Sequence, residues 1–139
     1  MSGEPTVSPA IIAGPGEPIA GAGGSFELHE WGGAPGRGPG IPLHVHHRGD
    51  EAWHVLEGVL RFRFADRSTE AIAGTTVFVP AGVAHTFSIA GPGDARYLIA
   101  MSTQIAELIA ALHEPELRDE DVAAVYRRFD SEIVAESEM

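Results

Sequence analysis

Residues 25–101 consist of short apolar or alternating runs that are separated by Gly, Pro and Asp. In residues 59–64, for example, the apolar Leu60, Phe62 and Phe64 alternate with two arginines, as in a strand with one buried face. Because none of these runs has helical spacing, the pattern predicts an antiparallel sandwich or barrel. The expected strands are 26–31, 42–47, 51–57, 59–64, 75–80, 85–90 and 95–101.

The hydrophobic period changes after residue 102, where the sequence predicts helices. Ser102 or Thr103 can cap the first helix, and a second helix is expected to begin near Asp119. We expect these helices to cover one side of the sheet or a partner chain. Their apolar stripes are Ile105, Leu108, Ile109 and Leu112 in the first helix, and Val122, Val125, Phe129 and Ile133 in the second.

Three segments are therefore expected along one domain. Residues 1–24 are rich in Gly, Pro and Ala and predict a flexible N-terminal arm, with at most one short edge strand. Residues 25–101 form the predicted barrel, and residues 102–139 form a C-terminal helical extension. A chain of 139 residues is long enough to bury a single core.

Composition excludes several classes of function. The net charge of −11 repels nucleic acid phosphates, so we expect no nucleic acid partner. The sequence has no cysteine and no lysine, which excludes disulfides, thiolate metal sites and Schiff-base chemistry. We also expect no membrane contact and a cytoplasmic protein, because no apolar run approaches the roughly 18–20 residues that span a bilayer and the N-terminus lacks a signal-peptide layout.

The candidate chemistry lies in two clusters. Residues 38–58 contain G-x5-H-x-H-x4-E-x6-G, and residues 74–85 contain G-x5-P-x-G-x2-H. The two patterns supply three imidazoles and one carboxylate, which suit a divalent metal with positions left open for a substrate. The matching residues are Gly38, His44, His46, Glu51 and Gly58 in the first pattern, and Gly74, Pro80, Gly82 and His85 in the second.

Strand geometry explains how these side chains could meet. His44 and His46 are two residues apart on a predicted strand, so they share a face. Residues 48–50 look like a tight turn, which predicts that Glu51 begins a hairpin partner of that strand. His85 needs only an adjacent strand to become the fourth ligand.

Other polar residues are weighed by the same parity. His47 and His54 are expected on the opposite face, at the surface or in a dimer interface. Trp53 shares the parity of Glu51 and is expected either to wall the pocket or to pack in the core. Nothing in the sequence singles out four further residues with polar groups, namely His29, Tyr97, His113 and Tyr126.

Both motifs resemble those of the cupin superfamily, and the sequence around them is similar to that of the quercetin dioxygenase-like group of small cupins. The one departure is Ile89, where the family often has Asn. The resemblance covers about residues 26–101 and implies a double-stranded β-helix, a jelly-roll barrel of six to eight strands with a metal at its centre. It also implies a homodimer.

The expected cofactor is one divalent transition metal per chain, held by His44, His46, Glu51 and His85. Iron, manganese, nickel, copper, cobalt and zinc all suit these ligands, so the sequence leaves the identity of the metal open.

Three functions remain open, all with a small-molecule substrate or ligand. The first is a metal-dependent dioxygenase for a small aromatic or enol-type substrate, in which Glu51 is a fourth ligand or a general base. The second is a non-redox isomerase, decarboxylase or cyclase. The third is a small-ligand-binding cupin without turnover, because fold alone does not determine chemistry.

Overall fold

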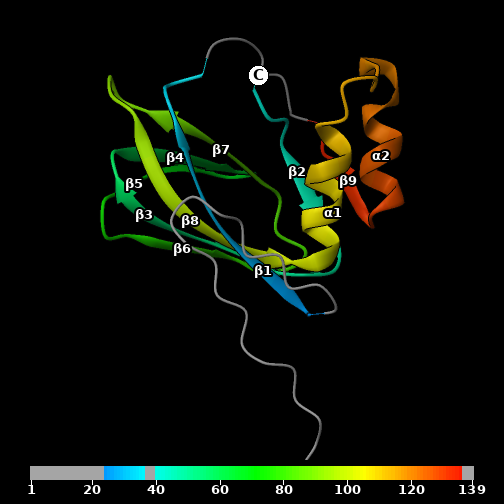
Figure 1. Ribbon diagram of the computed structural model, residues 1–139, viewed down its shortest axis with the longest axis horizontal. Helices are drawn as coiled ribbons and strands as arrows, with labels where there is room; N and C mark the ends of the chain where they lie inside the picture. The colour runs from blue at the N-terminus through cyan, green and yellow to red at the C-terminus, as the bar shows by residue number, and fades with distance from the viewer. Residues whose placement is uncertain (1–23, 37–39, 136–139) are drawn as a thin grey trace, which may run out of the picture.

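Figure 1 shows the computed structural model of the chain, of which residues 24–36 and 40–135 are described. Within these residues, nine strands form two antiparallel sheets, one in the order β1-β8-β3-β6 and the other in the order β5-β4-β7-β2-β9. This confirms the predicted all-β fold, a double-stranded β-helix with short C-terminal helices. The strands are β1 (Phe26–Gly33), β2 (His44–His46), β3 (Glu51–Glu57), β4 (Val59–Phe64), β5 (Ser68–Ile72), β6 (Thr76–Val79), β7 (His85–Ala90), β8 (Ala95–Ser102) and β9 (Ser131–Ile133).

The helices α1 (Thr103–Leu112) and α2 (Val122–Arg128) lie together beside β2 and β9 (Figure 1), and a short 3-10 turn, Asp119–Asp121, precedes α2. The side chain of Ser102 caps α1 by accepting a hydrogen bond from the backbone N–H of Ile105. No helix within the described residues is long and apolar enough to cross a membrane.

Two strands were not predicted. β5 escapes the alternation pattern because it is an edge strand in which only Ala71 is buried. β9 lies where the second helix was expected to continue as far as Ile133, and that expectation was wrong. The helix ends at Arg128, and Asp130 then adopts a left-handed backbone conformation with φ of 60°, which turns the chain into β9.

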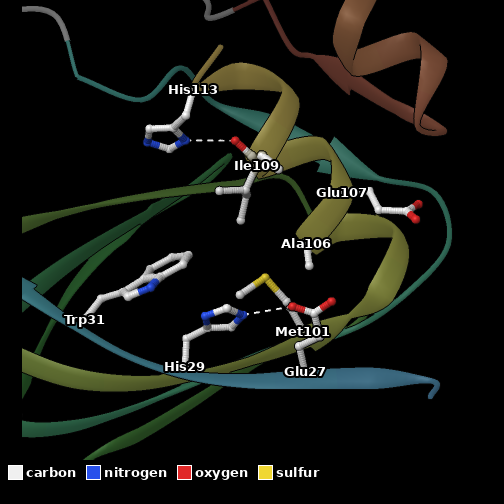
Figure 2. Close-up of a pocket in the computed structure, with 9 residues that line it drawn as sticks. Glu27, His29, Trp31, Met101, Ala106, Glu107, Ile109 and His113 are labelled. Atoms are coloured by element: carbon white, nitrogen blue, oxygen red, sulfur yellow. Dashed lines mark hydrogen bonds and ion pairs between the residues drawn. The ribbon is translucent and has the colours of Figure 1, made fainter. Parts of the chain in front are cut away.

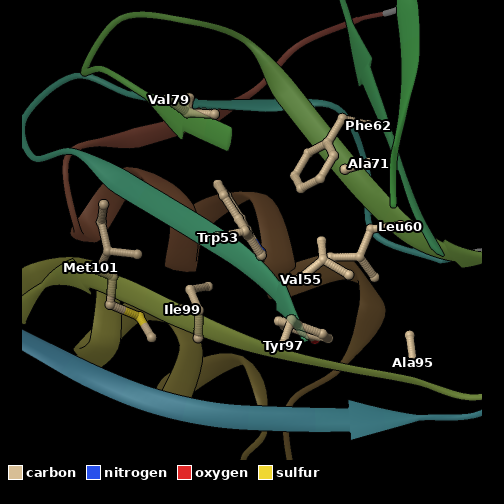
Figure 3. Close-up of a cluster of buried hydrophobic side chains, with 11 residues drawn as sticks. Trp53, Val55, Leu60, Phe62, Ala71, Val79, Ala95, Tyr97, Ile99 and Met101 are labelled. Atoms are coloured by element: carbon tan, nitrogen blue, oxygen red, sulfur yellow. The ribbon is translucent and has the colours of Figure 1, made fainter. Parts of the chain in front are cut away.

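Facing strands of the two sheets enclose the core (Figure 3). Residues 60 and 62 of β4 are fully buried, whereas Arg61 between them is exposed and pairs with Glu70, so the predicted alternation of this strand is confirmed. Trp53 packs edge-on against Phe62 at 5.1 Å between ring centroids. The buried cluster consists of Trp53, Val55, Leu60, Phe62, Ala71, Val79, Ala95, Tyr97, Ile99, Met101 and Ile105.

Gly58 is the single residue between β3 in one sheet and β4 in the other. Its φ of +80° is a conformation that favours glycine, and a Cβ atom there would collide with the backbone of Asp94 and Ala95. Gly74 has a similar φ of +91°, yet a Cβ atom at that position would meet nothing within 4 Å. Comparing substitutions at the two glycines therefore distinguishes the cost of backbone strain from the cost of steric collision.

We predict that Gly58→Ala lowers the free energy of unfolding by about 2–4 kcal/mol, because strain and collision add. Gly74→Ala, the matched control, should lower it by only about 1–2 kcal/mol, because strain acts alone. Urea denaturation followed by circular dichroism measures both values. Equal losses in the two variants would show that the close approach at Gly58 contributes nothing.

Candidate metal centre

The predicted ligand residues come from three strands. His44 and His46 lie on one face of β2, and His85 begins β7, where it pairs in register with His44. Glu51 begins β3, which belongs to the opposite sheet. The expected hairpin between the His44–His46 strand and β3 was therefore wrong: residues 47–50 carry the chain from one sheet to the other. The carboxylate faces the imidazoles across the barrel instead of along a ladder.

All four side chains are buried, and one ligand atom from each lies within 4.8 Å of the others. The carboxylate oxygen Oε1 of Glu51 lies 2.8 Å from Nε2 of His85 and 3.1 Å from Nε2 of His46. Imidazole nitrogens and a carboxylate oxygen at this spacing could hold one metal ion. Gly38, the first residue of the motif, lies outside the described residues.

The other ring nitrogen of each histidine is hydrogen-bonded away from the cluster. Nδ1 of His44 donates to the carbonyl of Pro42 at 2.8 Å, and Nδ1 of His85 donates to the carbonyl of Val83 at 2.9 Å. Carbonyl oxygens only accept, so these two bonds fix which nitrogen carries the proton.

His46 is fixed in the same way through β9. Its Nδ1 lies 2.7 Å from the hydroxyl of Ser131, and that hydroxyl donates its own hydrogen to the carbonyl of Phe129. Ser131 must therefore accept from His46. In its neutral form each of the three imidazoles therefore directs an Nε2 lone pair toward the cluster, which is the arrangement of metal-ligating histidines with outer hydrogen-bond partners.

Lone pairs facing a carboxylate repel it unless a proton or a cation lies between them. Within the described residues, Nε2 of His46 is a buried atom with no hydrogen-bond partner. Burial, together with the neighbouring His85 and His46, lowers the pKa of His44 to about 4, so this imidazole stays neutral at pH 7. The donor set therefore suits a cation. The reason is that the outer hydrogen-bond partners hold each proton on Nδ1 and leave Nε2 free to bind.

Glu51 is held ionised. Burial alone would raise its pKa, but protons on the adjacent Nε2 atoms of His46 and His85 would outweigh burial and lower the pKa to about 2. A carboxylate with so low a pKa is a good ligand and a weak base at neutral pH.

A pocket of about 440 Å³ opens onto the cluster. Its walls come from both sheets, from residues 40–42 and from the helices, and no arginine is among its described lining residues. The size is typical of a pocket for a small organic ligand. Besides the four candidate ligands, the lining side chains are Trp31, Ile41, Pro42, Trp53, Phe87, Tyr97, Ile99, Leu108, Ile109, Leu112, His113, Val122 and Tyr126.

Two tyrosines that sequence reasoning did not single out lie in this wall. Burial raises the pKa of Tyr97 to about 12, and burial together with the charge of Glu51 raises that of Tyr126 to about 12. Both hydroxyls therefore remain protonated donors at neutral pH. Strand parity could have found Tyr97, which pairs with Val55 on the Glu51 face of the sheet, whereas no local signal marks Tyr126 on α2.

The remaining predictions about polar residues are confirmed where the structure tests them. His47 and His54 point away from the cluster, where they bond to Glu132 and Thr76. Trp53 does both of the things expected of it, since it lines the pocket and packs in the core. His29 lies outside the pocket, and His113 lies in its wall.

Comparison with solved structures gives relatives of several activities. The polyketide cyclase RemF from Streptomyces resistomycificus is 28% identical, with a TM-score of 0.50 over 60% of each chain. A protein ascribed sugar phosphate isomerase activity, from Acidithiobacillus ferrooxidans ATCC 23270, is 24% identical, with a TM-score of 0.50 over 56% of this chain and 50% of that one. A cupin protein from Bacteroides fragilis is 15% identical, with a TM-score of 0.52 over 68% of this chain and 82% of that one.

This chain thus spans between half and 60% of the length of the isomerase and the cyclase. No curated protein matches the sequence. The model of the Cupin domain family matches residues 34–101, which contain β2 to β8 except the last residue of β8, and all four candidate ligands. The sequence match and the solved structures thus agree: residues 34–101 match the Cupin domain family, and the chain has the cupin fold.

Proposed function

We propose that His44, His46, Glu51 and His85 bind one divalent transition-metal ion per chain, and that the pocket beside them is an active site for a small organic substrate. One observation carries the proposal: three buried imidazoles, each with its Nδ1 proton bound elsewhere, direct Nε2 toward one buried carboxylate. A metal bound there supplies Lewis acidity toward substrate oxygens.

The pocket wall favours a neutral, largely apolar substrate with enol, phenol or ketone oxygens. The described lining residues carry no arginine, so a phosphate or sulfate group would have no cationic side chain to bind. Tyr97 and Tyr126 offer hydroxyl donors to substrate oxygens, and the aromatic rings of Trp31, Trp53 and Phe87 offer flat apolar contact.

The first candidate reaction is dioxygenation of such a substrate. In this reaction the apolar walls exclude water from reactive intermediates, and the tyrosines orient the substrate. Glu51 serves as the fourth ligand. With a pKa as low as about 2, it is a weak base toward a substrate proton.

The second candidate reaction is a non-redox cyclisation, and the likeness to a polyketide cyclase at 28% identity favours it. The same pocket suits it, since tyrosine hydroxyls that donate to a ketone oxygen would stabilise charge that develops there. The two reactions share the metal and the substrate class and differ in whether oxygen is consumed.

We predict about one equivalent of transition metal in protein purified without an affinity tag, and less than about a tenth of an equivalent in His44→Ala/His46→Ala, because two of four ligands are lost. The matched control is His47→Ala/His54→Ala, which removes two imidazoles that point away from the cluster. Elemental analysis measures all three proteins. Equal metal contents in the two double variants would place any metal elsewhere.

We predict that Ser131→Ala weakens metal binding by roughly 10- to 100-fold, because His46 loses the acceptor that fixes its tautomer. Ser88→Ala makes the same chemical change at an exposed position of β7 and should leave the affinity unchanged. Competition with a chromogenic chelator gives the affinities. An unchanged value for Ser131→Ala would mean that the hydrogen bond does not orient His46.

We predict that metal-loaded protein consumes oxygen with at least one member of a panel of enols, diketones and catechols. The residue-level control is His44→Ala/His46→Ala, which should consume none. An oxygen electrode and mass spectrometry of the products follow the reaction. Conversion of a substrate without oxygen uptake, under anaerobic conditions or with zinc, would reject dioxygenation and support cyclisation or another non-redox reaction.

A further inference from the structure

A second hollow lies between β1 and α1 (Figure 2). This groove encloses about 600 Å³, against about 440 Å³ for the metal pocket. Its floor is apolar, and Met101 lies between the strand and the helix. The described lining residues are Glu27, His29, Trp31, Met101, Ala106, Glu107, Ile109, Ala110 and His113.

The groove adjoins the metal pocket. Trp31, Ile109 and His113 line both hollows, so the two hollows share part of their walls. A ligand in the metal pocket that is long enough to reach past these shared residues would extend into the groove. Ala106 and Ala110 line the groove and not the metal pocket, so a substitution at either position changes the lining of the groove alone.

The groove carries a defined polar feature, the pair formed by His29 and Glu27. Nε2 of His29 lies 2.9 Å from Oε1 of Glu27, and both side chains are largely shielded, at 14% and 16% exposure. The His29 ring also lies against Trp31, at 5.3 Å between centroids. Glu27 accepts the Nε2 proton of His29, so in the neutral form of the ring Nδ1 is an acceptor, and no described residue bonds to it.

His113, at the end of α1, presents an acceptor in the same way. Its Nδ1 donates to the carbonyl of Ile109 at 2.8 Å, so in the neutral form of the ring Nε2 is an acceptor. The described lining of the groove includes two carboxylates and no arginine. It therefore offers acceptors, and a ligand that fits it must donate hydrogen bonds and carry no negative charge.

We propose that this groove is the second compartment of the substrate site. On the proposed function, the substrate is an elongated molecule with two ring-sized apolar parts. Its oxygen-bearing end lies at the metal centre, and a hydroxylated ring at its other end donates to His29. Trp31 contacts both parts, since it lines both hollows.

The groove can be tested without any metal. Titration of metal-free protein with 2-naphthol, a neutral ring with one hydroxyl donor, should show binding by ligand-observed NMR. Ala110→Phe fills the groove from an exposed position and should weaken binding by at least about tenfold, whereas Ala110→Ser adds almost no volume and should not. His29→Phe should weaken 2-naphthol severalfold, and naphthalene-2-sulfonate should bind no variant. Absence of 2-naphthol binding, or equal affinities in the two Ala110 variants, would overturn the proposal.

The link between the compartments is tested with the metal-loaded protein. Catechol probes the metal pocket alone, and 4-(4-hydroxybenzyl)catechol spans both hollows. The longer ligand should bind at least about tenfold more tightly, and Ala110→Phe should abolish that advantage while leaving catechol unaffected. Equal affinity of both ligands for the wild-type protein would overturn the two-compartment site and leave the metal-dependent function standing. If neither catechol binds while 2-naphthol still does, the metal-dependent function would be overturned instead.

Discussion

The site depends on one electrostatic constraint: four groups that can all accept a proton or a cation are buried together, and no arginine lies among the described residues that line their pocket. Removing a carboxylate and three imidazole lone pairs from water is unfavourable unless positive charge compensates them. The fold prevents the imidazoles from turning their protons toward the cluster, because the carbonyls of Pro42 and Val83 and the hydroxyl of Ser131 hold the Nδ1 protons on the outer side. The remaining lone pairs can be compensated only from within the cluster, by protons or by a metal.

The C-terminal segment takes part in this arrangement and is more than a cover. Ser131 of β9 orients His46, while α1 and α2 contribute Leu108 and Tyr126 to the pocket wall. The turn before β9 is held to the loop after β2 by the backbone bond from His47 to Asp130 and by the ion pair of Arg48 with Asp130 at 3.0 Å. A change in this segment would therefore affect the ligand geometry and the pocket shape together.

The sequence predicted the parts of the site that follow from strand alternation and motif spacing. His44 and His46 share a face because they are two residues apart, and His85 lies beside them because β7 pairs with β2. The hairpin assigned to Glu51 was wrong, because alternation specifies a face and says nothing about which sheet the next strand joins. Ser131 and Tyr126 could not be found at all, since their positions depend on how the C-terminal segment packs on the barrel.

The two hollows offer a substrate different polar groups. In the metal pocket, Tyr97 and Tyr126 stay protonated, so under the proposed function they could donate to substrate oxygens. In the groove, the pair of His29 with Glu27 accepts, so that end selects a donor. The net charge of −11 and the lack of arginine in the described lining of both hollows disfavour anionic substrates. A neutral molecule with acceptors at one end and a hydroxyl at the other would therefore bind in a single orientation, with its reactive oxygens at the metal centre.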